Sequence, residues 1–152
     1  MSIELQENHF VFCPKYRKPI FQDQKVRQQC EAIFRFIAER RGWQIKALSI
    51  MPDHLHLLLA RPRTISEAQV AQQLKGASSR ELRKNFPYLK GVSTYAFWAR
   101  NYHVDSVGLS NDETIQHYIE RQERAWLREH GKPAFVQAQP VKIKPVPQRR
   151  LP

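Results

Sequence analysis

Two histidines separated by one residue, His54 and His56, are the residues of this chain best suited to binding a metal or handling a phosphate. Side chains alternate between the two faces of a strand, so both imidazoles of "HLHLLLA" share one face and the intervening leucines share the other. Imidazole nitrogens bind several divalent metals. The pair therefore provides half of a metal or phosphate site, or, alternatively, two histidines that only pack against their neighbours.

A phenol and a carboxamide, Tyr118 and Gln122, lie four residues apart in a segment with helical periodicity, so one stands above the other on the same helix face. A phenol with a pKa near ~10 is a weak nucleophile at neutral pH, so attack on a phosphodiester needs an activated phosphate. A divalent cation held by His54, His56 and the amide oxygen of Gln122 would polarise the phosphate for attack by Tyr118. The alternative is that Tyr118 belongs to the core and Gln122 bonds to its hydroxyl.

The elements that must position these residues follow from hydrophobic periodicity and end signals. An apolar, β-rich run at 9–13 and the segments 43–51 and 54–60 predict strands, the last two joined by the "PD" turn. Helices are predicted from Asp23 to Gly42, from Ser66 to Phe86, and from a capping box at Ser110 and Glu113 to Gly131. The aromatic segment 92–108 predicts one or two further strands.

The charge of the chain favours a polyanionic partner. Twenty-five Lys and Arg against 14 Asp and Glu give a formal charge of +11 and a pI near 10.1. The sequence predicts a single domain at residues 1–132 and a basic, proline-rich tail at residues 133–152. No run approaches the roughly 20 apolar residues of a membrane span and no signal peptide is evident, which predicts a cytoplasmic protein with reduced Cys13 and Cys30.

Five motifs together resemble the single-tyrosine HUH transposases (TnpA) of the insertion sequence 200/605 family. They are "FVFCPKYRKPIF", "MPDHLHLLL", "QLKGASSRELRKNFP", "FWARNYHVDSVG" and "YIERQ", in the family's order and at about its spacing. The resemblance runs from about His9 to Glu129. One departure is Asp105, where relatives tend to carry a small residue.

The resemblance implies an α/β (α+β) fold of the HUH endonuclease type, with a central antiparallel sheet flanked by helices. It implies Tyr118 as the nucleophile that forms a 5′-phosphotyrosine, and His54, His56 and Gln122 as ligands of Mg²⁺ or Mn²⁺. It further implies a homodimer with active sites completed in trans, acting on single-stranded DNA with hairpin ends at insertion-sequence ends, in the nucleoid of a prokaryotic cell. The DNA-binding candidates are Lys15, Arg17, Lys18, Lys75, Arg80, Arg83 and Lys84.

Three other functions stay open at this point. The chain could be a domesticated relative that acts on palindromes, although "YIERQER" lacks the Asn-Pro that such proteins tend to carry. It could be another HUH endonuclease, although these usually have three histidines and a larger domain. It could also be a basic nucleic-acid-binding module without catalysis, in which His54, His56 and Tyr118 only pack.

Overall fold

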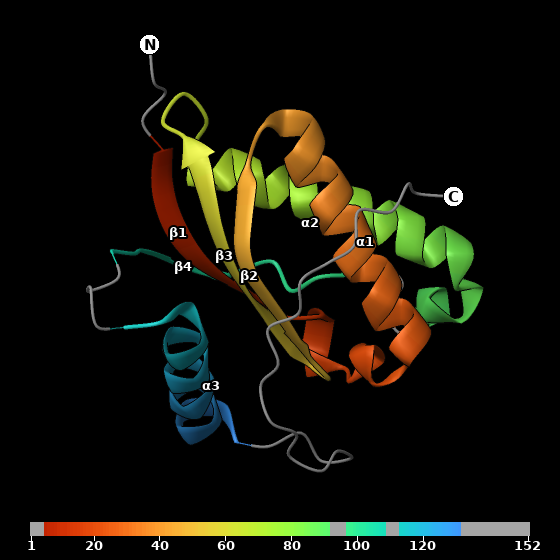
Figure 1. Ribbon diagram of the computed structural model, residues 1–152. Coiled ribbons are helices and arrows are strands. Elements are labelled where there is room, and N and C mark those ends of the chain that lie inside the picture. Colours follow the sequence, from red (N-terminus) through yellow and green to blue (C-terminus); the bar gives the residue numbers. More distant parts are fainter. Residues whose placement is uncertain (1–4, 92–96, 109–112, 132–152) are drawn as a thin grey trace.

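A four-stranded antiparallel sheet forms the centre of the protein (Figure 1). The computed structural model describes residues 5–91, 97–108 and 113–131. The strands are β1 (Leu5–Phe12), β2 (Gln44–Met51), β3 (His54–Pro62) and β4 (His103–Ser106), in the order β2-β3-β1-β4. β3 therefore lies between β2 and β1, with Val11 of β1 opposite His56 and Met51 of β2 opposite His54. The predicted antiparallel sheet flanked by helices is confirmed.

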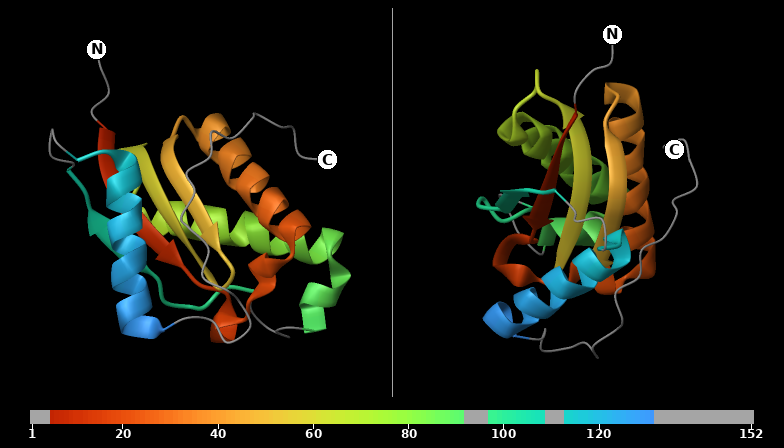
Figure 2. Two further views of the ribbon diagram at one scale, coloured as in Figure 1. Left: turned by 60° about the horizontal axis from the view of Figure 1, so that its bottom comes forward. Right: turned by 60° about the vertical axis from the view of Figure 1, so that its left-hand side comes forward.

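Helices cover both faces of this sheet (Figure 2). Helices α1 (Gln24–Arg41) and α2 (Glu67–Asn85) pack on one face, and α3 (Ile115–His130) lies on the other. The alternation of β3 divides its residues between these layers. Leu55, Leu57 and Leu59 enter the main core with α1 and α2, whereas Leu58 packs under α3. The histidines of β3 thus share one face, as the sequence predicted, and α3 covers that face.

The helix ends show where capping signals sufficed and where they did not. Asp23 caps α1 by accepting from the backbone N–H of Lys25, and Gly42, at φ 76°, ends that helix. The predicted start of the last helix was wrong, because Thr114 is the N-cap of α3 and accepts from the His117 N–H. Ser110 lies outside the described residues.

In its described part, 97–108, the aromatic segment contributes one short strand, β4, and one isolated bridge between Trp98 and Pro14. Trp98 is buried, and its indole N–H donates to Ser78 Oγ at 2.9 Å. Tyr95 and the tail at 133–152 lie outside the described residues. Cys13 and Cys30 are free thiols. Within the described ranges, no helix combines the length and apolar character needed to cross a membrane.

Candidate active site

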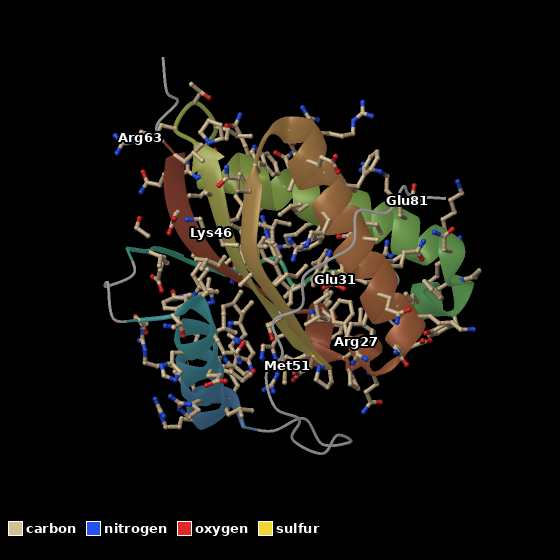
Figure 3. The ribbon with its side chains drawn as sticks, viewed as in Figure 1. Arg27, Glu31, Lys46, Met51, Arg63 and Glu81 are labelled. Carbon is tan, nitrogen blue, oxygen red and sulfur yellow. The ribbon has the colours of Figure 1, made fainter. Side chains whose placement is uncertain are left out.

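The two histidines of β3 meet a carboxylate from α3. His54 Nε2 lies 2.7 Å from Oε1 and 2.9 Å from Oε2 of Glu123, and His56 Nε2 lies 3.6 Å from Oε2. One ligand atom from each residue falls within 4.8 Å of the other two, and all three residues are buried. The site lies at the start of β3, just after Met51, which Figure 3 labels at the lower end of the sheet.

The other nitrogen of His54 is held by the turn that begins β3. Asp53 Oδ1 accepts from His54 Nδ1 at 2.8 Å, and Asp53 Oδ2 accepts from Arg17 Nη2 at 2.7 Å. The ring of Trp126, on α3, stacks on His54 with centroids 4.4 Å apart. A histidine whose Nδ1 is bonded to a carboxylate has its Nε2 aimed in a fixed direction, which is the usual arrangement around a metal ligand.

Charge is unevenly divided between the two histidines. Burial disfavours the charged form of His54, but its hydrogen bonds to Asp53 and Glu123 outweigh burial and raise its pKa. Burial would raise the pKa of both carboxyl groups, but hydrogen bonds from His54 to each of them and from Arg17 to Asp53 outweigh burial and lower the pKa of Asp53 and of Glu123. Burial lowers the pKa of His56. A carboxylate oxygen lies within hydrogen-bond distance of each ring nitrogen of His54, so positive charge is favoured on His54 and disfavoured on His56.

This donor set fits a divalent cation. His56 Nε2 is buried and has no hydrogen-bond partner among the residues that the structure describes, although it lies in the region shared by His54 and Glu123. A buried polar atom without a partner is costly, and a cation at this point would satisfy it. Two imidazoles and one carboxylate are a ligand set that suits Mn²⁺ and several other divalent metals. The cation would take the place of the proton that His54 now shares with Glu123.

Gln122, the ligand expected from the resemblance, lies beside the cluster of His54, His56 and Glu123 and is not a member of it. It is half-buried and lines a cleft of about 340 Å³ that His56 also borders. The cleft is lined mainly by β1, the segment leading to β4, and α3, including His9, Cys13, Asn101, His103, Trp126 and His130. Gln122 as a metal ligand therefore stays a prediction, while Glu123 is the α3 residue that contacts both histidines.

Tyr118, on α3, packs between this helix and the sheet instead of lining the cleft. Its side chain is 6% exposed and packs in one cluster with Ala47 and Leu58, and its ring meets that of His9 edge-on at 5.5 Å. Burial, assisted by the charge of Asp105, raises the pKa of Tyr118 to about 12. In this arrangement of α3 the phenol is protonated and shielded from solvent.

Asp105, the departure from the family pattern, lies at the surface of β4. Its Oδ2 is 2.6 Å from His103 Nε2, and both side chains are more than half exposed. Asp105 is thus a surface residue paired with His103, and its charge still reaches the Tyr118 phenol.

The DNA-binding candidates divide into inward and outward side chains. Arg17 points inward: its guanidinium donates to Asp53 and to the carbonyls of His130 and Gly131 at the end of α3. Lys75 Nζ donates to the carbonyl of Ala99 at 2.8 Å. Lys18, Arg80 and Lys84 are exposed, and Lys15 and Arg83 are half-buried. DNA contact by these residues stays a prediction, and the exposed three are the better placed.

Three residues of the site went unselected in the sequence analysis: Glu123, Asp53 and His9. Asp53 directly precedes the histidines, and a carboxylate next to a candidate metal ligand is a usable signal. His9 lies on the strand that pairs with β3. Glu123 interrupts the apolar stripe of its helix and is 4% exposed, which only packing reveals.

Comparison with known proteins decides the family. The family model described as "Transposase IS200 like" matches residues 2–122, a span that includes both histidines, Tyr118 and Gln122. The chain belongs to the IS200-like transposase family. This transposase is 38% identical over 115 residues to the transposase for insertion sequence element IS200 of Salmonella typhimurium, covering 75% of this chain and 74% of that protein. It is 32% identical over 117 residues to the ISDra2 transposase TnpA of Deinococcus radiodurans, covering 76% and 83%.

Solved structures agree with this assignment. A Deinococcus radiodurans protein described as a transposase superposes on the IS200-like transposase with a TM-score of 0.66 at 28% identity, covering 84% of this chain and 92% of that one. A REP-associated tyrosine transposase bound to a REP hairpin gives a TM-score of 0.52 at 14% identity, covering 87% and 73%. The second likeness shows the shared fold alone.

Proposed function

We propose that this IS200-like transposase cuts and rejoins single-stranded DNA at insertion-sequence ends, with Tyr118 as the nucleophile and a divalent cation at His54 and His56. The observation that carries the proposal is the buried cluster of His54, His56 and Glu123, which joins β3 to the same helix that bears Tyr118. A fold that only bound DNA would gain little from burying two imidazoles and a carboxylate around an unsatisfied nitrogen.

The chemical step is a phosphoryl transfer without external energy. The Tyr118 oxygen forms a bond to phosphorus, the bond from phosphorus to the 3′ oxygen breaks, and the phenolic proton is lost as the 3′ oxygen gains one. A bound divalent cation, Mg²⁺ or Mn²⁺, would supply Lewis-acid polarisation of the phosphate. His54, His56 and Glu123 would hold that cation in this arrangement, and Asp53 fixes the direction of His54. Rejoining is the reverse attack by a free 3′ hydroxyl on the 5′-phosphotyrosine.

A homodimer that completes its sites in trans is supported by the burial of Tyr118. On an α-helix, positions 118 and 122 differ by about 40° and positions 122 and 123 by about 100°. A helix that presents Glu123 to His54 and His56 therefore leaves Gln122 beside the cluster, at the cleft, and packs Tyr118 against the sheet. We propose that α3 of a second copy presents the Tyr118 and Gln122 face to the histidines during cleavage.

The proposed substrate is single-stranded DNA with hairpin ends, attracted by the basic surface. Lys18, Arg80 and Lys84 are exposed and serve as phosphate contacts, and the basic segment 133–152 is proposed as a tail outside the domain of residues 1–132. The protein would act in the cytoplasm of a prokaryotic cell, at its nucleoid.

Cleavage of the DNA that flanks the gene tests this function. Labelled single strands from both flanks are incubated with the protein and Mn²⁺, then separated on a denaturing gel. We expect a cleaved strand with a free 3′ hydroxyl and, with both ends present, a rejoined product, both abolished by EDTA. Tight binding without cleavage would identify a non-catalytic or domesticated relative.

A further inference from the structure

A third histidine, His9, lies behind the metal cluster and has no role in the function proposed above. It is on β1, is 1% exposed, and faces the same side of the sheet as His56. Because Val11 is opposite His56 and His9 is opposite Leu58, the two histidines are diagonal neighbours across the strand pair. His9 Nε2 lies 3.0 Å from His56 Nδ1.

The distribution of protons over this pair follows from the direction of His56. A metal needs the lone pair of His56 Nε2, so the proton of the neutral ring must be on Nδ1. That proton can only be donated, and the group within hydrogen-bond distance of it is His9 Nε2. His9 must then accept at Nε2 and carry its own proton on Nδ1, an atom that is buried without a partner among the described residues.

His9 also contacts Tyr118, the proposed nucleophile. Its ring meets Tyr118 nearly perpendicularly, at 86°, with centroids 5.5 Å apart. One imidazole therefore contacts the metal-ligand candidate His56 through a hydrogen bond and the nucleophile candidate Tyr118 through a perpendicular ring contact. By contrast, Asp53 supports His54 alone.

We infer that His9 is a positioning residue that accepts the Nδ1–H of His56 and so leaves the Nε2 lone pair of His56 directed at the metal. This inference rests on the metal role proposed for His54 and His56. Partners of this kind change metal affinity by about 10-fold to 100-fold when they are removed.

Mn²⁺ binding to the purified protein, measured by titration calorimetry without DNA, tests this role. His9→Leu keeps most of the volume but cannot accept a hydrogen bond, and we expect its Kd for Mn²⁺ to rise about 10-fold to 100-fold. His9→Gln restores an acceptor oxygen and should return the Kd to within about threefold of the original. Asn8→Leu is the matched control, because Asn8 is equally buried on the same strand but bonds to Arg61 and Glu67. It should lower the melting temperature and leave the Kd unchanged.

Several results would overturn the role of His9. One is a folded His9→Leu variant that binds Mn²⁺ as the original protein does. Another is an equal loss in His9→Leu and His9→Gln, which would assign His9 to packing alone. If His9→Leu does not fold, a tenfold weaker Kd in folded His9→Gln overturns the inference and an unchanged one supports it. An original protein that binds no Mn²⁺ would refute the metal site itself, which separates that failure from a failure of His9.

Discussion

Replacing Glu123 by alanine separates the two residues of α3 that compete for the role of third metal ligand. The carboxylate is 4% exposed and contacts His54 Nε2 at 2.7 and 2.9 Å, whereas the neighbouring Gln122 faces the cleft. Loss of one of three ligands should weaken Mn²⁺ binding at least about tenfold, which corresponds to about 1.4 kcal/mol. The matched control, Gln122→Ala, should stay within about threefold.

Thermal and chemical unfolding in the presence of Mn²⁺ also report the difference in Mn²⁺ affinity between the two variants. At a Mn²⁺ concentration 100 times the Kd, the ion stabilises the fold by about 2.7 kcal/mol, and a tenfold weaker Kd reduces that gain to about 1.4 kcal/mol. Without metal, Glu123→Ala should cost about 1 to 3 kcal/mol, because His54 loses one of its two carboxylate partners. An unchanged Kd for Glu123→Ala together with a tenfold loss for Gln122→Ala would refute this site and make Gln122 the ligand.

Three further changes test other parts of the account. Arg17→Ala should lower the free energy of unfolding by about 1 to 3 kcal/mol, because the buried carboxylate of Asp53 loses two hydrogen bonds. Urea unfolding measures this, and an unchanged midpoint would contradict a stabilising role for Arg17. Asp23→Ala should cost about 1 kcal/mol through loss of the α1 N-cap, whereas the exposed Gln24→Ala should cost almost nothing. Lys84→Ala should reduce the salt dependence of single-stranded DNA binding by about 0.7 in slope without changing stability, and an identical slope would exclude a phosphate contact.

The arrangement of strands and helices was largely predictable because it depends on local periodicity. The alternation of β3 placed both histidines on one face and Leu55, Leu57 and Leu59 on the other, and the structure confirms this division. The start of α3 was missed, since Ser110 and Thr114 are both capping residue types and intrinsic preference favours the serine, whereas the helix begins after Thr114.

The composition of the site was less predictable because it depends on contacts between distant elements. Rotating α3 by one residue, about 100°, exchanges Gln122 for Glu123, and only the packing of that helix on the sheet sets its rotation. The inward direction of Arg17 follows from a left-handed backbone at Tyr16 and Arg17, with φ 61° and 52°. Non-glycine residues rarely adopt that conformation, so no sequence pattern announces it. His9 required the strand register between β1 and β3.

The central claim is that Tyr118 becomes covalently joined to DNA, and peptide mapping of the adduct tests it most directly. The protein is reacted with a single strand from the flank of its gene in Mn²⁺, the DNA is trimmed with nuclease, and the protein is digested and analysed by mass spectrometry. The account predicts a nucleotide remnant on the peptide that carries Tyr118, and no adduct in Tyr118→Phe. A remnant on another residue, or cleavage that persists in Tyr118→Phe, would contradict the tyrosine mechanism.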